Sequence, residues 1–153
     1  MKRGSVPGAL IGIAGVHYVA AELSRRGLVA LPTIRNTAAY DIIVATPDGK
    51  RHANIQVKTS QRRANFWLMP RSDKICTKPN DYYVLVRWLR NQSRFEGFLL
   101  KGREAKKEVI DSEQRERKRG VEEKSMFHSV HVGGRWAKQE KRWKQEWDTW
   151  TLL

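Results

Sequence analysis

The sequence of 153 residues contains a single cysteine, Cys76, and very few acidic side chains in its centre. One cysteine excludes an intramolecular disulfide and a zinc site built from several cysteines, and it is typical of a reducing compartment such as the cytoplasm. No apolar run approaches the roughly 20 residues that a membrane-spanning helix needs, so we expect no membrane protein.

The shortage of acidic residues leaves a large positive charge. The 30 Lys and Arg residues outnumber the 16 Asp and Glu residues, which gives a net charge of +14. Residues 50–94 alone contain 11 basic and 2 acidic residues. Because each phosphate neutralised by Lys or Arg releases a condensed counterion, this excess favours nucleic acid as the partner. An anionic membrane surface is the second candidate.

The N-terminus superficially imitates a secretory signal, since Lys2 and Arg3 precede the apolar residues 6–16. Pro7 and the three glycines within that stretch, with Glu22 further on, favour a helix that stays in the protein.

Hydrophobic spacing predicts one α/β domain over residues 1–153. Apolar or small residues at helical spacing predict a first helix that packs on a sheet through one face: Ala9, Ile13, Val16, Ala20 and Leu23. Five strands are predicted, at 28–35, at 40–46, in a segment that ends at 54–58, at 82–89 and at 95–100. The apolar centre 42–44 indicates a strand covered on both faces. We expect a central mixed sheet of four to five strands, flanked by helices, with a core of about 8–101.

The remaining residues, about 102–153, predict a helical extension. In the predicted helix 103–119, Glu113 and Glu116 alternate with arginines, as on a solvated face. The tryptophans at 136, 143, 147 and 150 share one helical face, which predicts a core or a dimer interface. His128 and His131 lack a third ligand for zinc.

Asp41, Gln56 and Lys58 form the pattern with the most chemical content. Asp41 heads an apolar strand, and strand alternation places Gln56 and Lys58 on one face of the next strand with Val57 on the other. Adjacent antiparallel strands can then bring a carboxylate, an amide oxygen and an ammonium group together. This combination favours metal-assisted phosphodiester hydrolysis. Asp41, Gln56 and the backbone carbonyl of Val57 are the candidate metal ligands, and Lys58 would stabilise charge on phosphorus.

A basic, irregular segment follows over residues 61–80. It suits contacts with a nucleic-acid backbone, whereas Trp67 is expected in the core. The alternative is a solvated loop. The full set of candidate nucleic-acid-binding residues is Arg35, Asn36, Lys58, Arg62, Arg63, Arg71 and Lys74.

Residues 8–101 resemble the PD-(D/E)XK nuclease superfamily, which includes restriction endonucleases and archaeal Holliday-junction resolvases. The resemblance rests on a Gly-x-x-Gly phrase at 12–15, Arg26-Gly27, Asn36 ahead of Tyr40-Asp41, and Gln-Val-Lys-Thr at 56–59. The match is to the variant with Gln in the final motif, and it is close to the small stand-alone bacterial members. It implies a restriction-endonuclease-like core, Mg²⁺ or Mn²⁺ as cofactor, and hydrolysis of duplex or branched DNA.

Val16 departs from the family pattern. The first helix of those small members reads Gly-Glu-x-x-x-Ala-x-x-Leu, and the glutamate position falls on Val16 in the phrase 15–23. Since Gln56 also replaces a carboxylate, Asp41 is the one anionic ligand of the motif, and we expect weak metal binding. The alternative is a catalytically inactive, nuclease-derived module that binds nucleic acid or a protein. Besides DNA, a second copy of the chain is a candidate partner, in a homodimer.

Overall fold

The protein is described here by a computed structural model that covers residues 6–34, 39–61 and 65–150. The helices are α1 (Gly8–Arg25), α2 (Gly102–Lys118) and α3 (Ala137–Thr149). The strands are β1 (Val29–Pro32), β2 (Ile42–Ala45), β3 (His52–Ser60), β4 (Phe66–Leu68), β5 (Asp81–Leu89), β6 (Arg94–Lys101) and β7 (Ser129–His131).

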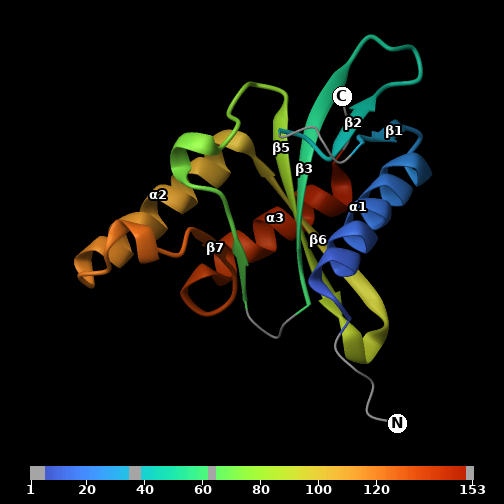
Figure 1. Ribbon diagram of the computed structural model, residues 1–153. Coiled ribbons are helices and arrows are strands. Elements are labelled where there is room, and N and C mark those ends of the chain that lie inside the picture. The colour runs from blue at the N-terminus through green and yellow to red at the C-terminus, as the bar shows by residue number, and fades with distance from the viewer. Residues whose placement is uncertain (1–5, 35–38, 62–64, 151–153) are drawn as a thin grey trace.

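Five strands form one mixed sheet in the order β1-β2-β3-β5-β6. Its neighbours run antiparallel except β3 and β5, which are parallel. Strands β4 and β7 pair separately, beside α2. Figure 1 shows α1 and α2 on opposite sides of the sheet. The expected mixed sheet of four to five strands flanked by helices is therefore confirmed.

Buried side chains form two hydrophobic cores, and successive residues of β5 alternate between them. Val84 belongs to the core under α1, and Leu85 belongs to the core under α2, β4 and β7. Trp67 is buried in the core under α2, β4 and β7, as predicted. Helix α3 packs on β6 and places Trp143 in one core and Trp147 in the other. Residues 137–149 are thus integral to the packing, and these two tryptophans are core residues.

The buried face of α1 differs from the predicted one. Ile13 is 39% exposed, and the buried residues are Ile11, Gly15, Val19 and Leu23, four positions apart. The sequence reading missed this stripe because a glycine carries no hydrophobic signal. Gly15 lies so close to β3 that a Cβ atom there would overlap the Thr59 side chain.

Three further expectations were wrong. Strand β2 is covered on one face only, since Ile43 is 42% exposed and no described helix or strand packs over it. Residues 66–68, expected within an irregular segment, form β4 because β7 supplies a pairing partner. Glu113 of α2 is 6% exposed instead of solvated, because Ser72 and His128 contact it.

No helix in the described ranges is both long and apolar enough to cross a membrane.

The contact between α1 and β3 predicts opposite effects for two glycines of the same helix. Gly15→Ala should lower the free energy of unfolding by about 1–3 kcal/mol, because the added methyl group collides with Thr59. Gly12→Ala, which adds a methyl group in open space, should raise it by up to about 1 kcal/mol through helix propensity. Urea denaturation of the two variants measures both effects, and stabilisation by both would contradict the close packing.

Candidate active site

Strand β3 extends further than its neighbour β2. The β2 pairing covers residues 52–55, whereas β5 pairs with β3 from Asn54 to Ser60. Within the described sheet, residues 56–60 therefore have a strand on one side only. Backbone groups on the open side need other partners, since buried peptide groups without hydrogen bonds are costly.

Asp41 provides such a partner at the point where the β2 pairing ends. Its Oδ2 atom accepts a hydrogen bond of 2.7 Å from the Val57 N–H. The Asp41 N–H donates to the Ile55 carbonyl at 2.9 Å, and the Thr33 N–H donates to the Asp41 carbonyl at the same distance. These contacts hold Asp41 between β1 and β3, and no described residue donates a hydrogen bond to its Oδ1.

Asp41 and Val57 line a pocket of about 390 Å³. Its other walls come from β1, the residue after it, and the N-terminal half of α1, including Ile13, Val16 and His17. The N–H and C=O groups of one strand residue point to the same edge, so the Val57 carbonyl faces the open side together with its N–H. The pocket thus combines one carboxylate and one carbonyl oxygen with a largely apolar helix wall.

Gln56 and Lys58 lie on the face of β3 opposite to Val57, as alternation predicts. The β3–β5 register pairs Gln56 with Tyr83 and Lys58 with Leu85, and both partners belong to the core under α2. The side chains of Gln56 and Lys58 are half-buried.

Lys58 lines a second pocket of about 400 Å³, between the start of α1 and β4. No carboxylate among the described residues lies within ion-pair distance of its ammonium group. The structure therefore brings Asp41 to Val57, but it places Lys58 in a neighbouring hollow. Gln56 lines neither of these two pockets.

The oxygen donors around Asp41 match a divalent metal incompletely. No group of three or more His, Cys, Asp or Glu side chains in the described ranges is arranged to hold a metal ion. Mg²⁺ commonly uses one or two carboxylates and is completed by water and substrate phosphate. Asp41 and the Val57 carbonyl could therefore hold a metal ion only if water and a bound phosphate supplied the remaining ligands.

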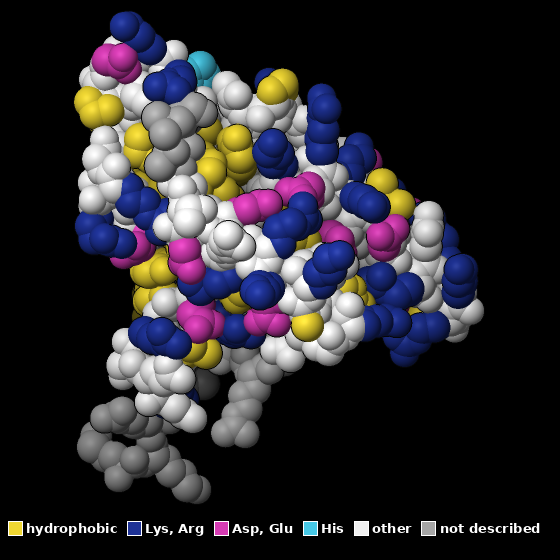
Figure 2. Space-filling model, turned by 180° about the vertical axis from the view of Figure 1, so that it is seen from behind, with side chains coloured by type: hydrophobic (Ala, Val, Ile, Leu, Met, Phe, Trp, Pro, Cys, Tyr) yellow, Lys and Arg dark blue, Asp and Glu magenta, His cyan; other side chains and the backbone are white. Residues whose placement is uncertain are grey.

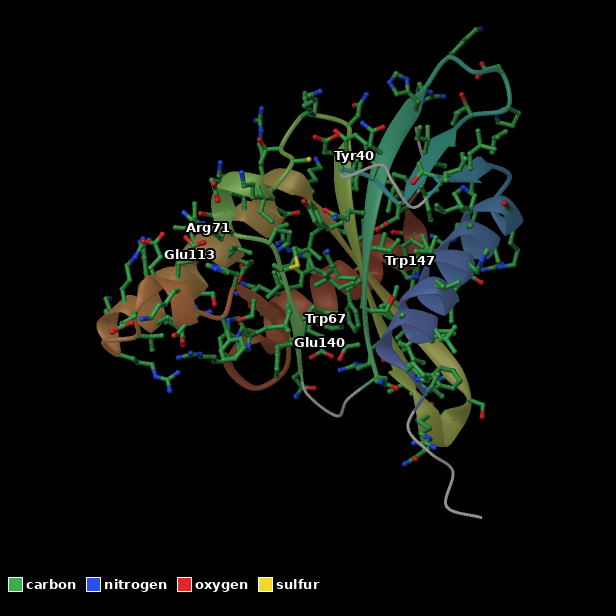
Figure 3. The ribbon with its side chains drawn as sticks, viewed as in Figure 1. Tyr40, Trp67, Arg71, Glu113, Glu140 and Trp147 are labelled. Carbon is green, nitrogen blue, oxygen red and sulfur yellow. The ribbon has the colours of Figure 1, made fainter. Side chains whose placement is uncertain are left out.

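The predicted nucleic-acid-binding residues are dispersed. Arg71 lies over α2, on the other side of β3 from α1 (Figure 3), and it forms ion pairs with Asp73 and Glu123. Lys74 is 3.9 Å from the same Asp73. The opposite view in Figure 2 likewise shows Lys and Arg interspersed with Asp and Glu. Four other candidates lie outside the described residues: Arg35, Asn36, Arg62 and Arg63.

Asp81 is a buried group beside the site that sequence reasoning missed. Its carboxylate accepts hydrogen bonds from the Asn54 side chain at 3.0 Å and from the Lys78 N–H at 2.8 Å. Burial, followed by the nearby Asp81 carboxylate, raises the pKa of the Tyr40 phenol to about 12. Both Asp81 carboxylate oxygens are therefore engaged by Asn54 and the Lys78 N–H. Because Asp81 follows Pro79 and Asn80, the sequence pattern is typical of an exposed turn residue, and the burial of this carboxylate was not predicted.

No protein-family model matches this sequence, and no curated protein resembles it closely enough to match. A solved structure with a similar course of the chain is that of a Holliday junction resolvase from Archaeoglobus fulgidus, an archaeal hyperthermophile. The two share 12% sequence identity at a TM-score of 0.48, over 86% of this chain and 88% of the resolvase. A likeness of this degree transfers no activity from one chain to the other.

Ser72, Glu113 and His128 form a second polar cluster, away from Asp41. The Glu113 carboxylate accepts hydrogen bonds from the Ser72 N–H at 3.0 Å and from the Ser72 hydroxyl at 2.9 Å, and His128 Nδ1 lies 3.0 Å from it. Ser72 contacts the carboxylate and not the imidazole, so the cluster lacks the arrangement that activates a serine nucleophile. Its role is to fasten the segment 72–74 to α2.

This cluster predicts a pH-dependent contribution to stability. Burial raises the pKa of Glu113, but the Ser72 hydrogen bonds and His128 outweigh it, so the pKa lies below its usual value. Glu113→Gln should lower the unfolding free energy near neutral pH by about 1–3 kcal/mol. Because the folded-state pKa is the lower one, the wild-type advantage is complete above the unfolded pKa and disappears as pH falls through the folded pKa.

Denaturant titrations at several pH values measure this advantage. The matched control is Glu116→Gln in the same helix, which removes only a pair with the exposed Arg119 and should change stability by less than about 0.5 kcal/mol. Equal losses in both variants would show that Glu113 is not the anchor.

Proposed function

We propose that this protein binds DNA through its phosphate backbone and hydrolyses it slowly, with a divalent metal, at the pocket of Asp41. The observation that carries the proposal is the Asp41 carboxylate fixed 2.7 Å from the Val57 N–H, on the open edge of β3. A phosphate at this edge would meet a carboxylate and a backbone carbonyl, and Lys58 lines the neighbouring pocket. Duplex and branched DNA are the expected substrates.

The charge distribution supports a phosphate partner. The chain carries a net charge of +14, and residues 50–94 contain two acidic residues, Asp73 and Asp81. Asp81 is buried, and Asp73 lies beside Arg71 and Lys74. Lys58 has no carboxylate within ion-pair distance in the described ranges, so its charge is available to a phosphate oxygen.

Each site residue has an expected role. Asp41 Oδ1 and the Val57 carbonyl would hold Mg²⁺ or Mn²⁺ together with the substrate, and Gln56 remains a candidate ligand. The metal, when bound, would polarise the scissile phosphate and lower the pKa of a water molecule. Lys58 would bind the phosphate oxygens from the adjacent pocket and stabilise the charge that develops there.

A second function, DNA binding without cleavage, is favoured by Val16. This residue lines the Asp41 pocket and packs partly into the core under α1. It places an isopropyl group on the wall where a second carboxylate would complete the metal shell. With one carboxylate in the pocket, metal affinity depends on the phosphate, and the balance between binding and cleavage is set by how well Asp41 alone retains the ion.

Asp41 separates the two functions experimentally. Plasmid and four-way-junction DNA are incubated with the protein in Mg²⁺ or Mn²⁺, and nicked products are quantified. Asp41→Asn should abolish nicking while DNA affinity stays equal or rises slightly, because a negative charge is removed near the phosphates. Asparagine is the matched substitution, since its side-chain oxygen can still accept the Val57 N–H.

Nicking by Asp41→Asn at the wild-type rate would exclude this pocket as the active site. DNA binding without nicking by the wild-type protein would establish the second function. Absence of DNA binding at low salt would exclude both.

Val16→Glu tests whether the helix wall faces the metal position. The variant should bind Mn²⁺ more tightly than wild type by isothermal titration calorimetry and should increase nicking, because it adds a second carboxylate to the pocket. The matched control is Val16→Gln, which has a similar shape but no charge. Both variants lose core packing and should be about 1–3 kcal/mol less stable. Equal metal affinity in the two variants would contradict the assigned geometry.

A further inference from the structure

A pocket of about 390 Å³, with several polar side chains in its lining, lies at the far end of β3, away from Asp41. The last β3–β5 pair joins Ser60 to Arg87, whereas β5 continues to Leu89. The pocket lies beside the part of β5 that extends past β3, between the end of β3 and the turn that connects β5 to β6. Trp88 and Leu89 of β5 therefore pair with β6 on one side and have no partner strand on the β3 side within the described sheet.

Among the described residues that line the pocket, four have carboxamide side chains and none is acidic. Gln61 donates from Nε2 to the Val6 carbonyl at 3.1 Å, which leaves Oε1 as an acceptor. Gln92 accepts from Arg94 through Oε1 at 2.6 Å, which leaves the Nε2 donors. Asn65 accepts from Arg87 at 3.4 Å, and Asn91 is exposed in the turn. The pocket thus offers both hydrogen-bond donors and acceptors.

Trp88 provides an aromatic wall of the same pocket. Its ring packs on Phe95 with centroids 4.6 Å apart, and Phe95 packs in turn on Tyr18 at 5.3 Å. Trp88 remains partly exposed. This backing holds the indole ring in place, so a flat ligand can stack on it with little loss of side-chain freedom.

The charge in the pocket comes from two arginines. Arg87 forms ion pairs with Glu96 at 2.9 Å and Glu140 at 3.1 Å, which offset its charge, and Arg90 is a second basic residue of the lining. A ligand that is flat, aromatic and rich in both donors and acceptors fits the pocket better than a phosphate or a carboxylate. A nucleobase has these properties, and its Watson–Crick edge is available only when it is unpaired.

The pocket is also continuous with the surface that holds Lys58. Gln61 lines both pockets, and it follows Lys58 by three residues, or roughly 10 Å along an extended chain. A DNA strand with a phosphate at Lys58 can therefore extend toward Trp88.

We propose that this pocket binds an unpaired base of the DNA strand whose backbone lies at Lys58. The base stacks on Trp88, and the carboxamides of Gln61, Asn91 and Gln92 contact its edge. The inference rests on the proposed DNA binding, and it specifies a preference for DNA with single-stranded or unpaired positions, such as the centre of a branched substrate.

Fluorescence anisotropy tests the preference with a labelled single strand, a duplex of the same length, and a single strand of the same length that carries abasic sites throughout. Trp88→Leu should weaken binding of the ordinary single strand about tenfold, the loss expected from one stacked base. Binding of the duplex and of the abasic strand should change by less than about twofold, within the spread of surface substitutions. Trp88→Phe should retain most of the affinity.

Two controls keep the result interpretable. Trp136→Leu removes another partly exposed tryptophan, outside this pocket, and should leave all three affinities unchanged. If Trp88→Leu is unfolded by circular dichroism, the exposed pair Asn91→Ala and Gln92→Ala replaces it, with the same expected selectivity.

Equal weakening of the single strand and the abasic strand would overturn the base pocket, as would no weakening of either. Displacement of the single strand by an acidic peptide at comparable concentration would also overturn it and would indicate an anion site. Failure of the wild-type protein to bind any DNA would instead overturn the proposed function.

Discussion

The open edge of β3 is the constraint on which the site depends. A strand that extends beyond its neighbour leaves backbone groups that require hydrogen bonds. Here the Asp41 carboxylate accepts a hydrogen bond from the first of them, the Val57 N–H. The same hydrogen bond fixes the carboxylate at a place where solvent and a ligand can reach its second oxygen. The Asp41 side chain therefore both satisfies a backbone group of β3 and offers an oxygen atom to a ligand.

Helix α1 can form the wall of that site because a glycine lets it approach the sheet. Gly15 packs directly against Thr59, and this contact brings the preceding turn of α1 beside Asp41. The wall is apolar where it meets the carboxylate, owing to Ile13 and Val16. An ion held by a single carboxylate against such a wall depends on its substrate for further ligands, which makes binding and cleavage separable properties in this protein.

Much of the fold could be predicted from the sequence, since it depends on local periodicity. Alternation correctly separated Val57 from Gln56 and Lys58, and the long apolar runs located β5 and β6. Contacts between distant segments were not predictable in this way. Strand β4 requires β7, Glu113 is buried because Ser72 and His128 contact it, and Ile43 is exposed on a face that no helix or strand of the described ranges covers.

The sequence alone determined the positive charge, the order of Asp41 and Gln56-Val57-Lys58 along two strands, and the valine in the first helix, because composition and spacing are properties of the chain itself. Only the tertiary structure decided that Asp41 meets the Val57 backbone, that Lys58 lies in a separate hollow, and that Trp88 lines a pocket together with carboxamide side chains. These outcomes depend on where strands end relative to one another, and strand ends are set by pairing with distant residues.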